Sequence, residues 1–232
     1  MSETSIAIIT ARGGSKRIPK KNIKDFCGKP IIAYSIDAAV GSGLFEEVMV
    51  STDSEEIAEV AKQYGAKVPF MRSAKTSDDF ATTADVLHEV LEEYAKLGQE
   101  FDQMACLYPT APFITGQKLK SAFDMLEQEG IDSAYPVIPF SYPPMRCLVI
   151  RDGSLMMKWP EYARTRSQDL ETLYHDCGQF YVYKVKEYMS GKELRTAPII
   201  VSELEVQDID NEVDWKLAEL KYQLMIEGSH NR

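Results

Sequence analysis

The stretch that decides the fold lies near the N-terminal end and reads Ile6-Ala7-Ile8-Ile9-Thr10-Ala11-Arg12-Gly13-Gly14-Ser15-Lys16. Its first half is a short apolar run that stops at a polar segment with two glycines. A run of this length, bounded by turn residues, is typical of a buried strand that ends in a loop. Glycines let a backbone approach an anion closely, and peptide N–H groups in such a loop can point at it. The stretch therefore predicts a buried strand followed by an anion-binding loop.

Basic residues concentrate in this loop although the whole protein is acidic. The 232 residues hold 26 Lys and Arg against 36 Asp and Glu, a formal net charge of −10. Such a balance argues against nucleic acid or an anionic membrane as a partner, because binding to either depends on basic surface. The loop and the residues after it reverse the charge locally with Arg12, Lys16, Arg17, Lys20, Lys21 and Lys24. This cluster favours a nucleoside triphosphate as the ligand, with a solvated basic turn as the alternative; the spacing fits neither a Walker loop nor Gly-x-Gly-x-x-Gly.

Strand-like and helix-like segments alternate along the chain. Short apolar runs predict strands at 6–10, 47–51, 68–71, 104–108, 178–183 and 198–201. Amphipathic spacing predicts helices around 31–40, 57–64, 86–94, 119–126 and 211–226. This order predicts an α/β fold, in which helices flank both faces of a mostly parallel sheet. We expect residues 1–232 to form a single domain.

Residues 133–175 interrupt this rhythm. They begin with a proline-rich and aromatic stretch at 135–144, and Leu148–Ile150 and Ser154–Trp159 flank Arg151-Asp152-Gly153. That pattern predicts an antiparallel hairpin inserted into the parallel fold. Such an excursion often carries a subunit contact or a substrate lid, so we expect it to mediate a homodimer.

The scarcity of metal-binding side chains limits the chemistry. Only three histidines are present, and the four cysteines (27, 106, 147 and 177) form no Cys-x-x-Cys pair. A structural zinc site and a disulfide framework are therefore not expected, and a reducing cytoplasm fits. Any metal has to bind carboxylates, which points to a hard ion such as Mg²⁺, or Mn²⁺. We expect no signal peptide or membrane helix at the N-terminal end, because its apolar run is too short.

Four blocks of sequence together resemble one enzyme family. They are Ile9–Lys16 with Lys21-Asn22, Leu107–Phe113, Arg166–Leu170, and Asp208-Ile209-Asp210 with Asp214. In this order they resemble the CMP-sialic acid synthetases, the cytidylyltransferases of nine-carbon acidic sugars. The resemblance runs over nearly the whole chain. It implies a Rossmann-like nucleotidyltransferase fold, CTP and such a sugar as substrates, a divalent ion and a homodimer.

The resemblance also assigns residues to the two substrates. The nucleotide would be bound by Ala11, Arg12, Gly13, Gly14, Ser15, Lys16, Lys21, Asn22, Arg72, Ala81 and Thr83. Arg12, Lys21 and Asp210 would be the catalytic residues. The sugar would be bound by Tyr108, Arg164, Arg166, Gln168, Gln179 and Phe180. The alternative interpretations are a surface role for Arg164, plain core for Phe180, and N-capping of the helix that follows for Thr83.

The same resemblance places the ion on Asp208 and Asp210. Residues i and i+2 of an extended chain point to the same side, so the two carboxylates can share one ion. The alternative is that both are turn residues. Asp214 has a second interpretation: with Asn211 as N-cap it would be the third residue of the last helix, where a carboxylate is favoured.

Two departures from the sialic acid enzymes concern the sugar. Tyr108 stands where they usually have glutamine, and Tyr174–Tyr181 stands where they typically read Asn-Gly-Ala-Ile-Tyr. Both departures resemble the pseudaminic acid branch of the family. Sialic or legionaminic acid remains the alternative sugar. An enzyme for the eight-carbon acid Kdo and a non-catalytic CTP-binding regulatory protein are the more distant alternatives.

Overall fold

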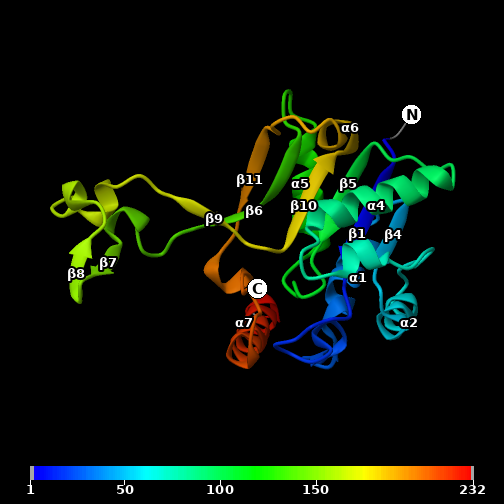
Figure 1. Cartoon of the computed structure of the whole chain (residues 1–232), viewed down its shortest axis with the longest axis horizontal. Helices are drawn as coiled ribbons and strands as arrows, with labels where there is room; N and C mark the ends of the chain where they lie inside the picture. The colour runs from blue at the N-terminus through cyan, green and yellow to red at the C-terminus, as the bar shows by residue number, and fades with distance from the viewer. Residues whose placement is uncertain (1–2, 231–232) are drawn as a thin grey trace.

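The apolar run near the N-terminal end forms the buried strand β1 (Ser5–Thr10). The computed structural model, which describes residues 3–230, places β1 inside a seven-stranded sheet, between β4 (Glu47–Ser51) and β5 (Gln103–Leu107) (Figure 1). Both neighbours run parallel to it. Ile6 to Ile9 are completely buried because both faces of the sheet are covered.

The other half of the sheet is mixed. Strand β10 (Phe180–Lys184) runs antiparallel to both its neighbours, β5 and β6 (Ser133–Pro139). Beyond β6, the edge strand β11 (Thr196–Ile200) is parallel to it and β9 (Tyr174–Asp176) is antiparallel. Five of the seven strands therefore point the same way, which confirms the predicted mostly parallel sheet.

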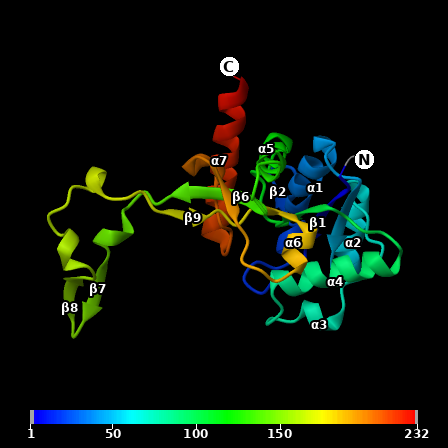
Figure 2. The ribbon, with the colours of Figure 1, turned by 90° about the horizontal axis from the view of Figure 1, so that it is seen from above.

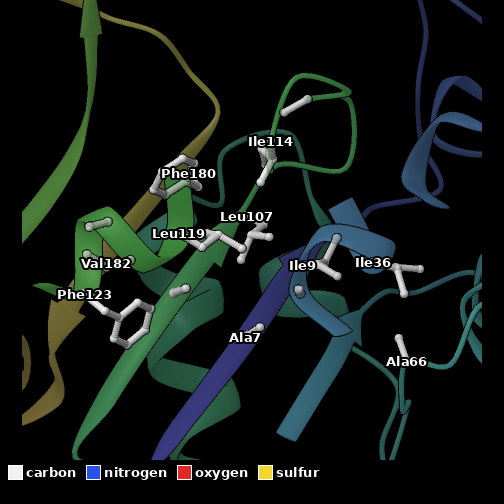
Figure 3. Close-up of a cluster of buried hydrophobic side chains, with 14 of the residues drawn as sticks. Ala7, Ile9, Ile36, Ala66, Leu107, Ile114, Leu119, Phe123, Phe180 and Val182 are labelled. Carbon is white, nitrogen blue, oxygen red and sulfur yellow. The ribbon is translucent and has the colours of Figure 1, made fainter. Parts of the chain in front are cut away.

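Helices cover the two faces of the sheet separately. The α-helices are α1 (Ile31–Ser42), α2 (Glu55–Gln63), α3 (Ala74–Ser77), α4 (Thr83–Lys96), α5 (Gly116–Leu126), α6 (Val185–Met189) and α7 (Glu212–His230). Ala7 and Ile9 of β1 pack in a core with α1, α2 and α5 (Figure 3), whereas Ile6 and Ile8 pack against α4 (Figure 2). The alternation of side chains along β1 thus divides the core into two layers.

The smaller elements complete the chain. The short strands are β2 (Asp25–Phe26), β3 (Lys29–Pro30), β7 (Leu148–Arg151) and β8 (Ser154–Met157). The 3₁₀ turns are η1 (Lys21–Ile23), η2 (Pro144–Arg146), η3 (Pro160–Tyr162), η4 (Ser167–Asp169) and η5 (Glu203–Glu205). Within residues 3–230, no helix has both the length and the hydropathy that crossing a membrane requires.

The strand predicted at 68–71 is wrong. Lys67 makes one parallel bridge to Met49, and the chain then leaves the sheet. Pro69 has no N–H group to donate to the ladder, so pairing ends here. The turn brings Arg72 back to the end of β4, where its N–H donates to the Thr52 carbonyl at 2.8 Å.

The last helix, α7, is held by a separate aromatic cluster. Trp215 is 3% exposed and meets Phe26 edge to face, with 5.6 Å between the ring centroids. Tyr222, two turns further on, contacts Phe26 and Tyr34 in the same way. These contacts seat α7 against the segment that follows the basic loop.

Residues 140–173, called the arm below, extend away from the sheet (Figures 1 and 2). The predicted hairpin is present: β7 pairs antiparallel with β8, and Arg151 pairs with Ser154 across the turn. The insertion is shorter than the predicted 133–175, because 133–139 form β6 and 174–176 form β9 of the main sheet. Its apolar side chains stay largely exposed, with Ile150 at 77% and Leu155 at 66%. The role of the arm as a subunit contact stays a prediction.

A substitution at a buried position tests the packing of the main core. Leu119 on α5 is completely buried between the helix and the sheet. We expect Leu119→Ala to lower the free energy of unfolding by about 2–5 kcal/mol, because it removes transfer free energy and leaves a cavity. Urea unfolding followed by circular dichroism measures this. Leu97→Ala is the control, since Leu97 is 62% exposed; equal losses for both variants would contradict the assigned core.

Candidate functional site

An open cavity of about 490 Å³ lies at the carboxyl ends of β1, β4 and β5. This is the edge at which parallel α/β sheets usually bind ligands. Among the predicted nucleotide-site residues, the cavity is lined by Arg12, Ser15, Lys16, Lys21, Asn22, Arg72, Ala81 and Thr83. Tyr108 and Asp210 line it as well. Segments from four distant parts of the sequence therefore meet around one space.

The loop after β1 is fixed from two sides. The Asn22 side-chain amide donates to the Arg12 carbonyl at 2.9 Å, and the Gly13 N–H donates to Asp53 Oδ1 at 2.7 Å. A Cβ atom on residue 13 would lie 3.1 Å from the Ser54 Cβ, so only glycine fits without a shift. Gly13 lines a smaller neighbouring cavity of about 130 Å³, while Ala11 is completely buried. Gly14 belongs to the lining of neither cavity.

One carboxylate holds two of the predicted phosphate-binding cations. Asp79 Oδ1 lies 3.0 Å from Arg12 Nη1, and its second oxygen accepts a hydrogen bond from Lys16 Nζ. The bond from Lys16, followed by that from Arg12, lowers the pKa of Asp79. Asp79 therefore stays ionised at neutral pH and lies where a triphosphate would have to meet both cations.

Lys21 lies between the loop and the aspartates near α7. Its ammonium group donates to the Ile209 carbonyl at 2.7 Å. Burial lowers the pKa of Lys21, and the nearby charges of Asp210 and Asp208 partly oppose that shift. Arg17 pairs directly with Asp210, at 2.7 Å from Nη2 to Oδ1. The basic and acidic residues of the site are thus in direct contact through this ion pair.

Arg72 forms the opposite wall. It is 8% exposed, and its guanidinium donates to the Ser51 hydroxyl at 3.0 Å and to the Ser51 carbonyl at 2.7 Å. These bonds tie the wall to the end of β4. Glu89 on α4 accepts a hydrogen bond from the Thr76 hydroxyl at 2.7 Å. This bond fixes α3, the short helix that follows Arg72.

Tyr108 marks the side predicted for the sugar. Its hydroxyl lies 3.4 Å from the Thr83 hydroxyl, and its ring centroid is 5.6 Å from that of Tyr181. The Tyr181 hydroxyl donates to Asp176 Oδ2 at 2.6 Å. Burial and this bond raise the pKa of Tyr181, so it is a neutral donor at physiological pH.

The other residues predicted to bind the sugar lie away from this cavity. Phe180 is completely buried in the main core, and Gln179 is 3% exposed, with its amide donating to the Glu205 carbonyl at 2.5 Å. Arg164, Arg166 and Gln168 are on the arm, where Arg166 pairs with Asp169. Neither group lines the cavity of its own chain.

The aspartates near α7 divide into two roles. Asp214 accepts hydrogen bonds from the N–H groups of Asp210 and Asn211, and Asn211 caps the helix in return. Asp214 therefore makes the contacts expected of a residue that caps the helix. Asp210 lines the cavity, whereas Asp208 is exposed beside it. The residues between 3 and 230 contain no group of three or more His, Cys, Asp or Glu placed to hold a metal.

Cys177 and His88 carry reactive atoms, but their surroundings indicate a structural role. Burial raises the pKa of the Cys177 thiol to about 12, so it stays protonated at neutral pH. The His88 ring lies 5.4 Å from that of Tyr188, outside the lining of the main cavity. Neither is positioned to act on a ligand bound there.

Several residues of the site were not foreseen from the sequence. Asp79, Thr76 and Asp78 line the cavity, and Asp176 holds Tyr181 beside it. The one available signal was an acidic pair, Asp78-Asp79, within the polar block that begins at Arg72. Nothing in a linear sequence shows that Asp79 meets Arg12, which is 67 positions away.

Sequence comparison identifies the family. The sequence model described as Cytidylyltransferase matches residues 6–207. The chain belongs to the cytidylyltransferase family. Pseudaminic acid cytidylyltransferase of Campylobacter jejuni is 38% identical over 97% of this chain and 99% of its own length. CMP-N,N'-diacetyllegionaminic acid synthase of Legionella pneumophila is also 38% identical, over 92% of this chain and 94% of its own.

A solved structure agrees with the fold of this cytidylyltransferase. The structure of CMP:2-keto-3-deoxy-manno-octonic acid synthetase complexed with CTP matches 97% of this chain and 99% of its own, with a TM-score of 0.67. At 19% sequence identity this likeness concerns the fold alone. It confirms the predicted α/β nucleotidyltransferase architecture.

Competition for the cations gives a test of the site. We expect Asp79→Asn to tighten CTP binding about two- to five-fold, because a neutral amide no longer competes with the phosphates for Arg12 and Lys16. Calorimetric titration with CTP in magnesium buffer measures this. Asp37→Asn, which removes the surface partner of Lys29, is the control. Weaker binding by the Asp79 variant alone would mean that Asp79 supports the nucleotide site.

Proposed function

We propose that this protein transfers CMP from CTP to the anomeric hydroxyl of a nine-carbon acidic sugar, most closely pseudaminic acid, and releases pyrophosphate. One observation carries the proposal: the cavity brings the cations Arg12, Lys16 and Lys21 together with Asp210 and Tyr108. The first four suit a nucleoside triphosphate, and the tyrosine lies where the sugar would bind. The family membership and the 38% identity to a pseudaminic acid cytidylyltransferase support the same activity.

The chemistry would depend on positioning and charge. The sugar hydroxyl attacks the α-phosphorus in line with the departing pyrophosphate, and no covalent intermediate with the protein is required. Arg12 and Lys16 can neutralise the phosphates once Asp79 releases them. Lys21 lies deeper and is anchored on the Ile209 carbonyl, so it can hold a charged oxygen in a fixed place. Preorganised cations of this kind stabilise charge that develops in the transition state.

The carboxylates at the far side of the cavity fit a divalent ion. Asp208 and Asp210 offer hard oxygen donors, and both are close enough to influence the charge of Lys21. Mg²⁺ commonly binds one or two carboxylates and completes its shell with water and substrate phosphate oxygens. We assign these two residues to Mg²⁺ or Mn²⁺. The ion would neutralise phosphate charge and polarise the attacking hydroxyl.

Tyr108 and Tyr181 support a sugar with a less polar tail. Tyr108 presents a ring where the sialic acid enzymes usually have an amide, and Tyr181 packs behind it. Pseudaminic acid ends in a deoxy carbon, so it loses no hydrogen bond to an aromatic wall. Gln179 would support this wall from behind, because its carbonyl accepts a hydrogen bond from the Tyr108 N–H at 2.8 Å. Phe180 would act only through the main core, in which it packs on the other face of the sheet.

The arm suggests why Arg164, Arg166 and Gln168 are away from the cavity. We propose that the protein is a homodimer in the cytoplasm and that these three residues meet the sugar bound by the other copy. An arginine can bind the sugar carboxylate through two parallel hydrogen bonds. Arg166 would exchange Asp169, its exposed partner, for that carboxylate.

A panel of sugars tests the substrate. We expect pseudaminic acid to give a kcat/KM about 100-fold or more above that of N-acetylneuraminic acid, because the hydroxylated tail of the latter would leave polar groups unpaired against the ring of Tyr108. Pyrophosphate release with CTP and each sugar measures it, with legionaminic acid and Kdo in the panel. Equal values for the first two sugars would refute the pseudaminic assignment but retain the transferase. No release with any sugar would favour a regulatory CTP-binding protein.

The metal assignment has its own test. Asp210→Asn should lower kcat at least about 100-fold, equivalent to about 2.7 kcal/mol of barrier, because a neutral amide is a poor Mg²⁺ ligand. Steady-state assays at saturating magnesium measure the change. Asp124→Asn is the control, because Asp124 lies on the exposed face of α5 and pairs there with Lys120. Near wild-type turnover of the Asp210 variant would remove this residue from the metal site.

A further inference from the structure

Residues 206–210, called the carboxylate segment below, connect η5 to α7 and carry Asp208 and Asp210. The segment has no regular secondary structure, so neither a helix nor a strand ladder fixes its course. Its far end is held at Ile209, which is 1% exposed in the aromatic cluster that seats α7 and whose carbonyl accepts the hydrogen bond from Lys21. The position of the two carboxylates therefore depends on the side chains that hold both ends of the segment.

Two side chains hold the near end of the segment at Glu205. The Gln179 amide donates to the Glu205 carbonyl at 2.5 Å. Lys118 Nζ lies 2.9 Å from Glu205 Oε1 and also donates to the Phe113 carbonyl at 3.0 Å. Gln179 is 3% exposed, and the side chain of Lys118 is 13% exposed. Hydrogen bonds that are shielded from water in this way fix a geometry more firmly than exposed ones do.

Gln179 also contacts the residue that marks the sugar side of the cavity. Its carbonyl accepts a hydrogen bond from the Tyr108 N–H at 2.8 Å. Tyr108 lines the cavity, whereas Gln179 lies behind it and does not. One buried residue thus joins Tyr108, through its backbone, to the carboxylate segment, through its side chain.

The amide of Gln179 is only partly satisfied. Its side-chain oxygen is buried and accepts no hydrogen bond within residues 3–230. A buried polar atom without a partner lowers the stability of a fold. An apolar side chain of the same length would avoid that cost and fill the same space. Stability therefore gains little from a glutamine at this position, and what the glutamine adds is the bond to Glu205.

We propose that Gln179 is a positioning residue, which fixes the carboxylates Asp208 and Asp210 relative to the sugar wall at Tyr108. The inference rests on the proposed function, in which the two aspartates bind the ion and Tyr108 faces the sugar. In-line attack on the α-phosphorus requires the sugar hydroxyl and the phosphate to be aligned, and a displacement of about 1 Å can cost about 100-fold in rate. Gln179 acts through its two neighbours and contacts no reacting atom.

Substitution by methionine tests this role, because methionine keeps the length of the side chain and removes the amide. We expect Gln179→Met to lower kcat about ten-fold or more. A second readout needs no turnover: calorimetry gives the Kd of CTP in EDTA divided by its Kd in Mn²⁺, and this ratio reports the contact between ion and protein. The ratio should fall at least about three-fold in the variant, while the Kd in EDTA stays unchanged. The thermal midpoint should stay within about 2 °C of the wild-type value, because the variant loses one hydrogen bond and one unpaired oxygen together.

Two further variants complete the design. Gln103→Met is the matched control, since Gln103 is 9% exposed and begins β5 at the end opposite the cavity; it should change neither kcat nor the ratio. Lys118→Met removes the other support of Glu205 and should lower the ratio as well. It takes the place of Gln179→Met if that variant unfolds, and a wild-type ratio would then count against the proposal.

Three outcomes would overturn the positioning role. They are wild-type kcat and ratio in Gln179→Met, a lower thermal midpoint with an unchanged ratio, which would assign Gln179 to packing alone, and equal losses in Gln103→Met. The proposed function fails in a different way. An Asp210→Asn variant that keeps the wild-type ratio would refute the metal site itself.

Discussion

Cations gathered to bind a triphosphate would repel one another, and in this protein carboxylates pair with them and hold them together. Asp79 bridges Arg12 and Lys16, and Asp210 pairs with Arg17. Under the proposed function the same carboxylates would compete with the substrate phosphates or bind the metal. Binding of nucleotide and ion would therefore have to rearrange these pairs. Exposed ion pairs contribute little stability, so the exchange costs little and the cations remain available.

The sheet supplies the fixed frame for this exchange. Strand β1 is buried on both faces, and its end delivers Arg12 to the cavity while the end of β4 anchors Arg72. Lys21 reaches across to the Ile209 carbonyl, 188 positions later in the chain. The segment just before α7 is therefore tied to η1, which follows the basic loop. Buried strands with exposed ion pairs at their ends suit an enzyme that stabilises charge through positioning.

Apolar side chains are exposed on two surfaces of the molecule. The arm and the outer side of α7 both lie outside the packed core, where Ile150 is 77% and Leu220 58% exposed. A chain that forms its cavity from one copy and receives Arg164 and Arg166 from another would couple catalysis to assembly. The buried core and the aromatic cluster around Trp215 hold each copy together independently of that contact.

The sequence alone determined the strand and basic loop, the order of the main elements and the hairpin, because these depend on local periodicity, glycines and charge. It failed at 68–71, where Pro69 ended a strand that apolar residues favoured. Only the tertiary structure decided that Asp79 meets Arg12, that Phe180 is core, and that the arginines of the arm lie away from their own cavity. Those facts depend on which distant segments the sheet brings together, and local pattern carries no information about that.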